Sequence, residues 1–548
     1  MRRFVLAVVV LAACSGTGPQ FLGAQPSWRG GDPRTIVAGP VTFAPAGESV
    51  SRYNEPLAAV PHTALNDAVI AAVQDAAVHA NVRAPIADPR LFRACAELAE
   101  IVPEEGIVGY TLVEFALQRN GIIEPSPHLL VVWEPLDPPQ LIIDQLGPRI
   151  AEILADGSIA RLGIGAAKRS ADGSGAVVFA LQGSGVSTAP IPRTLAAGGS
   201  TVLDAVVDAH YRDPEVFVTH DDGVTEQLAL QPGRPGGFTA QLACAAHRGR
   251  QQIEITASDA TGPTVLANFP LWCGAAPPAS VTIDPAHDDA PAATAEEAER
   301  RVFASVNRDR GAAGLLPLVW DDRLAAVARA HSAEMQRTHI VAHVSPATGS
   351  SADRVRAANI KTTLVLENVA RAYGVNEAHQ GLMNSPGHRA NIMSSAATQI
   401  GIGVVFGDEI SGRREMFITQ VFTRVPPVID RAATIEAVRK KLVVVRRALA
   451  VKPELSAVAQ DLATALAAGA TREAASQHLK PKLDGFARGY QRLSSVIIPT
   501  TEVDGLDGAS LLGDVAADDV GIGVAQGMHP ELGANAIWIV LLLGTHRH

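Results

Sequence analysis

Residues 321–335 read DDRLAAVARAHSAEM, and this stretch carries the pattern that decides the fold. The positions three, four, seven and eleven residues after Leu324 lie on one helix face, and they hold Val327, Ala328, His331 and Met335. The same stripe returns in DPRLFRACAELAEIV from Asp88 and in KPELSAVAQDLATAL from Lys452. The sequence therefore predicts three buried helices built on one pattern.

A second signature follows each of these helices, and it predicts a pair of strands. The first strand of each pair alternates glycine with branched residues, as LGIG at 162–165, IGIG at 400–403 and VGIG at 520–523. The predicted partner strands are residues 177–181, 416–422 and 536–543. Two landmarks in one order, three times, predict three homologous α/β units. The alternative is coincidental amphipathic helices in an alanine-rich chain.

The N-terminal residues predict export from the cytoplasm. Two arginines precede ten apolar residues, 4–13, a run that is too short to span a bilayer and typical of a signal-peptide core. The sequence LAAC at 11–14 resembles a bacterial lipoprotein cleavage box. That resemblance implies a lipid on Cys14 and, because Ser15 is not acidic, an outer-membrane location. The alternative is an ordinary secretory peptide cut just before an incidental cysteine.

Composition excludes several classes of protein. The chain has 548 residues, which predicts three to four domains at roughly 150 residues each. Its 47% hydrophobic and 19% charged residues exclude a wholly disordered chain. A net charge of −10 and 4% aromatic residues leave no basic footprint or stacking platform, so we expect no nucleic-acid partner.

Between the first and second units the pattern changes to short β-type runs separated by turns, which predicts a β-sandwich. Cys244 and Cys273 both fall on predicted strands, and in an oxidising compartment we expect them to form a disulfide. Cys95 and His331 lie on the helix stripes, so we expect Cys95 to be a small core residue and His331 a hydrogen-bonded core histidine.

The middle unit carries a family resemblance. VNRDRGAAGLLPLVWDDRLAAVARAHSAEM from Val306, then AHVSP, LENVA, NSPGHRANIM, GIGVVF and FITQVF, resemble the bacterial branch of the CAP superfamily, whose domain is also called SCP. The resemblance covers residues 296–423 and implies an α-β-α sandwich around a small, mostly antiparallel sheet. The two outer units resemble this family only in the helix stripe and the glycine-rich strand.

The predicted class is therefore α+β, with a CAP-type α-β-α sandwich, two degenerate CAP-like α/β units and one all-β sandwich. The predicted segments are a lipoprotein signal peptide (1–13), a flexible tether (14–60), a degenerate CAP-like unit (61–182), the β-sandwich (183–275), a linker (276–294), the CAP/SCP domain (295–425) and a second degenerate CAP-like unit (430–548).

The resemblance also implies a ligand site, because in some members of the family His and Glu side chains of a central cleft bind a divalent metal. Carried over residue by residue, these ligands are His343 in AHVSP, Glu367 in LENVA and His388 in NSPGH. Phe417 occupies the position of a further histidine, which leaves Ser385 or water as the fourth ligand. Such a set suits Zn²⁺ or a similar cation. The alternative is a structural polar cluster.

Residue physics is compatible with that site. Ser385 is a good helix N-cap and Pro386 a good first helical residue, which places His388 near the positive end of the helix dipole and favours neutral imidazole. Ser385 and His388 lack a visible orienting acid or oxyanion hole, so we do not expect them to form a nucleophile and base. Ungapped alignment from the helices places Glu134 and Ile498 opposite Glu367, so neither outer unit keeps the set.

The resulting hypothesis is a lipid-anchored CAP/SCP-domain protein of the cell envelope. It would bind a small molecule, lipid, peptide, cell-wall component or protein in the His/Glu-lined cleft, with or without a metal. One alternative is a metal-dependent hydrolase in which Glu367 is ligand or base. The other is a scaffold whose units make protein contacts.

Overall fold

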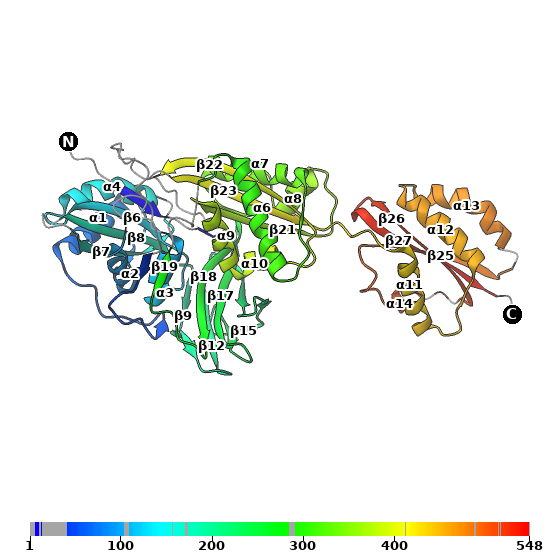
Figure 1. Ribbon diagram of the computed structural model, residues 1–548, viewed down its shortest axis with the longest axis horizontal. Coiled ribbons are helices and arrows are strands. Elements are labelled where there is room, and N and C mark those ends of the chain that lie inside the picture. Colours follow the sequence, from blue (N-terminus) through cyan, green and yellow to red (C-terminus); the bar gives the residue numbers. More distant parts are fainter. Residues whose placement is uncertain are drawn as a thin grey trace.

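The computed structural model describes residues 6–9, 12–13, 41–102, 109–155, 157–169, 174–283, 291–410, 413–486, 489–512, 515 and 517–546 (Figure 1). Cys14, the predicted lipidation site, lies outside these residues. Helix and strand each account for 34% of the chain, which fits the α+β class. Within the described ranges no helix has the length and apolar character needed to cross a bilayer.

The N-terminal unit is a mixed sheet with helices on both faces. Its strand order is β1-β6-β8-β7-β5, with β1 at Leu6–Val9, β5 at Ile86–Ala87, β6 at His128–Pro135, β7 at Ile159–Lys168 and β8 at Ser174–Gly183. The helices are α1 (Ala64–Ala80), α2 (Pro89–Ala99), α3 (Tyr110–Arg119) and α4 (Gln140–Leu154). Helices α1 and α4 cover the face with Leu130 and Val132, and α2 and α3 cover the face with Leu129 and Val131.

The second unit consists of two packed sheets. One has the order β11-β18-β17-β13-β14, formed by Thr194–Leu195, Gly262–Cys273, Gly249–Asp259, Arg212–Thr219 and Thr225–Gln227. The other has the order β15-β16-β12-β9, formed by Leu230–Pro232, Gly237–Ala243, Ser200–Val207 and Val186–Thr188. Their inner faces share one apolar core. The predicted disulfide between Cys244 and Cys273 is present; Cys244 directly follows β16 rather than lying on it.

The predicted tether and linker are partly built into these units, which corrects both expectations. Strand β3 (Val41–Phe43) pairs with β19 (Val281–Ile283), and β4 (Arg52–Tyr53) pairs with β10 (Ile191–Pro192). The reason is Tyr53, which is fully buried in the sandwich core against Phe269 and donates its hydroxyl proton to the Pro270 oxygen at 2.7 Å. This aromatic residue therefore anchors the segment around β4 in the sandwich core.

The third unit has its helices on both faces of a sheet of order β2-β21-β23-β22-β20. These strands are Ala12–Ala13, Val365–Ala372, Arg413–Thr423, Gln399–Ile410 and Val319–Trp320. Helices α6 (Ala295–Ala312), α9 (Val375–Asn384) and α10 (Pro386–Ile392) share a core with one face of the sheet. Helices α7 (Asp322–Thr338) and α8 (Ser351–Ala357) pack on the other.

The C-terminal unit lies apart from the other three in Figure 1 and repeats this layering. Its sheet has the order β24-β26-β27-β25, formed by Ala450–Val451, Asp519–His529, Gly533–Thr545 and Arg492–Thr500. Helices α11 (Arg431–Val445) and α14 (Gly508–Leu512) pack on one face. Helices α12 (Pro453–Ala467) and α13 (Arg472–Phe486) pack on the other.

The three α/β units share one sheet order and one close contact. In each, the glycine-rich strand lies between a two-residue parallel strand and the antiparallel partner that follows it. The stripe helix crosses that strand so closely that a Cβ at Gly403 would lie 2.1 Å from the Arg329 nitrogen of α7. Equivalent backbone contacts hold Gly163 and Gly165 against α2 and Gly521 and Gly523 against α12. The glycines are therefore required by the approach of helix to strand.

This contact predicts the effect of adding a side chain. Gly403→Val should destabilise the third unit by about 3 kcal/mol, because the new carbon atoms meet backbone that has no room to move. Urea unfolding measures this loss. The control is Gly311→Ala in α6, where no atom lies within 4 Å of the new Cβ, and it should be neutral or stabilise by about 0.5 kcal/mol. Equal effects of the two substitutions would contradict the packing argument.

Candidate functional site

Glu367 is the centre of a buried polar cluster in the third unit. Its carboxylate, 6% exposed as a residue, accepts a hydrogen bond from Arg354 Nη2 at 2.5 Å on one oxygen. The other oxygen lies 3.0 Å from His343 Nδ1. Burial alone would raise the pKa of Glu367, but the hydrogen bond and charge of His343 and the charge of Arg354 hold it below its ordinary value. Both carboxylate oxygens are thus engaged by this protein's own side chains.

Arg354 reaches Glu367 because of the way α8 begins. Ser350 and Asp353 form a capping box at its N-terminus, which fixes the first turn. Arg354, in this turn, donates from Nη1 to the Gly349 oxygen at 2.6 Å and from Nη2 to the His343 oxygen at 3.2 Å. The Arg354 guanidinium therefore hydrogen-bonds both to the loop before α8 and to the Glu367 carboxylate on β21.

His388 lies at the start of α10 and is also buried. Its Nδ1 lies 2.5 Å from Ser385 Oγ. Burial, with a smaller contribution from the charge of His343, lowers the pKa of His388 to about 3, so the imidazole is neutral. Ser385 is the N-cap residue, as predicted, but its side chain does not cap the helix. That expectation is corrected, because the hydroxyl donates instead to Glu254 Oε2 of the sandwich.

The β-sandwich covers this part of the third unit, which we call the CAP face and define as His343, Val344, Ser385 and Gly387. Glu254 of β17 accepts hydrogen bonds from the Ser385 hydroxyl and, at 2.8 Å, from the Gly387 N–H. At the tip of the β17–β18 hairpin, the Thr261 oxygen accepts from two consecutive backbone N–H groups. These are His343 N at 3.1 Å and Val344 N at 2.9 Å. No pattern in the sequence predicted either of these contacts.

The predicted metal ligands lie in one region but do not form a tight set. Within the described residues, one group of three or more His, Cys, Asp or Glu side chains has ligand atoms all within 4.8 Å of one another, and it does not contain His343, Glu367 or His388. Arg354 also holds a positive charge against the Glu367 carboxylate. The Zn²⁺ site stays a prediction that this geometry does not favour.

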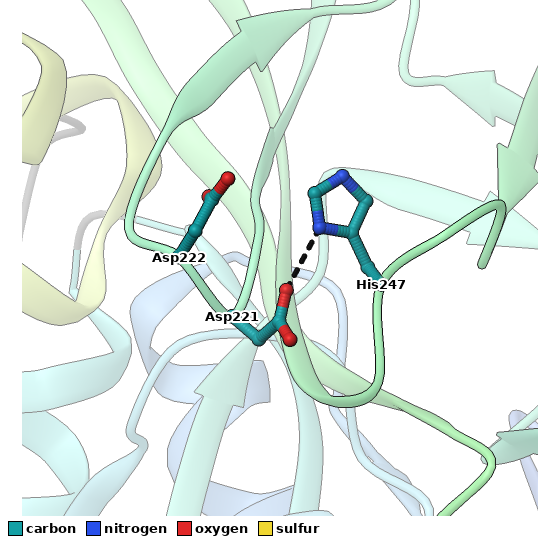
Figure 2. A group of neighbouring side chains, drawn as sticks. All are labelled: Asp221, Asp222 and His247. Atoms are coloured by element: carbon teal, nitrogen blue, oxygen red, sulfur yellow. Dashed lines mark hydrogen bonds and ion pairs between the residues drawn. The ribbon is translucent and has the colours of Figure 1, made fainter.

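The group that does meet this criterion is Asp221, Asp222 and His247, on exposed turns of the sandwich (Figure 2). Asp221 Oδ1 lies 2.8 Å from His247 Nδ1, while its Oδ2 accepts from the Arg248 N–H. Asp222 accepts from the Val224 N–H within its own turn. These hydrogen bonds show that both carboxylates stabilise turns of the sandwich.

Several buried or half-buried polar residues beside Glu367 belong to the family motifs but had no predicted role. Asn368 donates to the His388 oxygen at 3.2 Å and to Gln420 Oε1 at 3.0 Å. Asn391 donates to Asn368 Oδ1 at 2.9 Å. They occur in LENVA, FITQVF and NSPGHRANIM, and among them Gln420 lies on the predicted strand 416–422, where a polar residue was the available signal.

Sheet register corrects the comparison of Glu367 with the outer units. Through the partner strand, Glu367 lies in register with Gly401, the first glycine of its strand. The residues in register with the matching Gly163 and Gly521 are Leu129 and Ser495, not the expected Glu134 and Ile498. Ungapped counting failed because the loops between helix and strand differ in length. The conclusion that neither outer unit keeps the carboxylate is unchanged.

A pocket lies where the first three units meet. Its cavity volume is small, about 30 Å³, and its walls include Tyr110 and Glu114 of α3, Asn268 of β18, and Arg371 and Gly381 of the third unit. Burial raises the pKa of Glu114 to about 7, although hydrogen bonds from Ser126 and Gln118 act against this. Residues of all three units line this pocket, and none of the lining residues is a predicted ligand.

Three further residues considered in the sequence, His331, Cys95 and Phe417, are all buried in the structure. His331 is 2% exposed and its Nε2 lies 2.8 Å from the Ala342 oxygen, so it is the predicted hydrogen-bonded core histidine. Cys95 is a buried free thiol whose pKa burial raises, as predicted for a core residue. Phe417, in the place of a further histidine, is buried beneath the Arg371 guanidinium.

Comparison with known proteins identifies the third unit. Residues 303–422 match the family model described as CAP, the cysteine-rich secretory protein family. Two similar proteins of Bacillus subtilis (strain 168) are the uncharacterized protein YkwD, 36% identical over 108 residues, and the uncharacterized membrane protein YlbC, 35% identical over 107. The match spans 42% and 31% of their lengths and about a fifth of this chain. The CAP resemblance is confirmed for this unit.

Two similar solved structures come from bacteria. An extracellular SCP-domain protein of Bacillus anthracis is 21% identical, with a TM-score of 0.21, over 32% of this chain and 60% of that chain. An outer surface protein of Borrelia burgdorferi is 18% identical, with a TM-score of 0.22, over 24% of this chain and 96% of that chain.

The Arg354–Glu367 pair predicts a large loss of stability when the cation is removed. Arg354→Met should lower the free energy of unfolding by about 3 kcal/mol at pH 7, because it leaves a buried carboxylate without its charge partner. The loss should be smaller at pH 4 than at pH 7, because without the charge of Arg354 the Glu367 carboxyl takes up a proton at a higher pH than it does in the unsubstituted chain. Urea unfolding at both pH values measures it.

The control is Arg356→Met on the same helix, which removes an exposed pair with Asp353. It should change the unfolding free energy by less than about 0.5 kcal/mol. If the two arginine substitutions have equal effects, the buried pair is not a stabilising element of the cluster.

Proposed function

We propose that this chain is a lipid-anchored, extracytoplasmic protein whose CAP domain binds an extended polypeptide segment. The observation that carries this proposal is that the CAP face already holds polypeptide, supplied by the chain's own sandwich. Consecutive N–H groups of His343 and Val344 converge on one carbonyl oxygen, and the start of α10 receives a carboxylate. When proteins bind peptides, main-chain hydrogen bonds supply affinity and side-chain contacts supply specificity, and both kinds of contact are present here.

The hydrogen bonds and the burial of the polar side chains favour a binding function over hydrolysis. A metal ligand or general base needs an available carboxylate oxygen, and both oxygens of Glu367 are engaged by His343 and Arg354. A serine nucleophile needs an exposed hydroxyl, and Ser385 is fully buried. These groups are suited to holding the loop and helix that form the CAP face.

The location rests on other features. The apolar leader and the LAAC sequence at 11–14 support export and lipidation at Cys14, and cleavage before Cys14 would remove the edge strands β1 and β2 from their sheets. The disulfide of the sandwich supports an oxidising compartment, because such bonds are rare in the cytosol. We therefore place the CAP domain outside the cytoplasm, in the cell envelope.

A peptide copy of the hairpin tests the binding function. The labelled peptide RQQIEITASDATGP, residues 250–263, is titrated into the full chain carrying Glu254→Ala and Gly262→Val, which remove the hydrogen bonds of Glu254 and crowd the hairpin tip against His343. Fluorescence anisotropy should report saturable binding with a Kd on the order of 10 μM. A scrambled peptide should not bind, and adding Ser385→Ala should weaken binding at least about tenfold, the value of one charge-assisted hydrogen bond. Absence of saturable binding to the folded double variant would refute the function.

A further inference from the structure

The outer strand of the C-terminal sheet has no neighbouring strand on one side. Among the described residues, β25 is the last strand in the order β24-β26-β27-β25, and it is in register with β27 along its whole length. The backbone N–H and C=O groups on its other side therefore have no strand to bond to in the described part of the chain. Such an edge is a template for one more antiparallel strand.

The middle of β25 is uncharged and apolar. After Arg492 the strand continues as LSSVIIPT, without another charged side chain. Val496, Ile497 and Ile498 pack against the helices on the two faces of the sheet. They are only half-buried, whereas residues 536–544 of the neighbouring β27 are buried. An edge strand that stays single is usually protected by a charged side chain, and the middle of β25 has none.

The equivalent strands of the other two α/β units accept an added strand. β6 and β21 hold the place of β25, because each pairs with the partner of its glycine-rich strand. In the uncleaved chain, β1 pairs antiparallel with the outer side of β6, and β2 pairs antiparallel with the outer side of β21. The geometry of this fold therefore leaves room for an antiparallel strand at the edge that β25 forms.

The first and third units also contact each other by these equivalent edges. Tyr373, the residue after β21, is buried in the core of the first unit together with Leu130 and Val132 of β6. Ser126, just before β6, and Ala370 of β21 line the same pocket. The start of β6 thus lies near the end of β21. The C-terminal unit lies apart from the other three in Figure 1, and in the described part of the chain no α/β unit lies beside β25.

We propose that the chain forms a two-fold symmetric dimer in which β25 pairs antiparallel with β25 of a second copy. The pairing joins the two four-stranded C-terminal sheets into one continuous sheet. A second copy fits this edge because each strand offers the other the same row of backbone donors and acceptors, and no charge in the middle of either strand opposes the approach. It also repeats the contact of the first and third units, in which equivalent edges of one fold meet.

Opposite charges in the middle of β25 test this pairing. Sedimentation velocity on the full chain with Cys14→Ser, which prevents lipidation, should show a monomer–dimer equilibrium with a Kd on the order of 10 μM. Ser495 is exposed, so Ser495→Lys and Ser495→Glu should leave the fold intact. Each should weaken dimerisation at least about tenfold, because like charges then meet across the two-fold axis. An equimolar mixture of the two variants should associate as tightly as the unsubstituted chain, because the charges are then opposite.

The control is Ala450→Lys on β24, an exposed residue at the opposite edge of the same sheet. It should leave the dimer unchanged. A chain that stays monomeric at about 100 μM would overturn the dimer. Equal effects of Ala450→Lys and Ser495→Lys would overturn the assignment to the β25 edge, and failure of the lysine and glutamate variants to associate with each other would contradict direct strand pairing.

The direction of the two strands is tested by disulfide crosslinking in the same Cys14→Ser background. An antiparallel pair centred on β25 brings position 495 close to its own copy and holds position 492 roughly 25 Å from its copy. Under mild oxidation Ser495→Cys should therefore crosslink at least about tenfold faster than Arg492→Cys, although both positions are exposed. Equal rates at the two positions would indicate a parallel pair and contradict the two-fold arrangement.

Discussion

The close approach of a helix to a glycine-rich strand is the constraint on which three of the four units depend. In each unit the helix backbone lies where a side chain on the strand would have to be, and the strand therefore keeps glycine at alternate positions. This contact fixes which face of the sheet the stripe helix covers, and the sheet order follows in all three units. Loops and outer helices are then free to differ, because the contact does not involve them.

Differences in those loops explain why one unit carries the polar cluster. In the third unit the loop after α7 brings His343 to β21, and α8 brings Arg354 to the same carboxylate. At the equivalent sheet positions the outer units have Leu129 and Ser495, which place no charge there. One architecture thus supports a buried charged cluster in one unit and uncharged residues at the equivalent positions of the other two.

Local pattern made much of the fold predictable. The stripe helices, the glycine-rich strands, the disulfide and the buried states of His331 and Cys95 follow from periodicity and residue type. The contact of Glu254 with Ser385 was not predictable, because it joins residues 131 positions apart through the packing of two units. Burial of Tyr53 was missed for the same reason, since a composition rich in glycine and proline is compatible with both a tether and a packed strand. The ligand residues came only from family resemblance, and register between units required the strand pairing.

The disulfide has a consequence for how the covering hairpin can be removed. Cys244 and Cys273 are 29 positions apart in the sequence, and their disulfide closes a covalent ring of chain. Both β17 and β18 lie inside that ring. Glu254 and Thr261 are therefore on a closed loop of chain. A protease that cuts anywhere within the ring leaves both new ends attached through the sulfur atoms. A hairpin that has been cut once is therefore retained on the molecule.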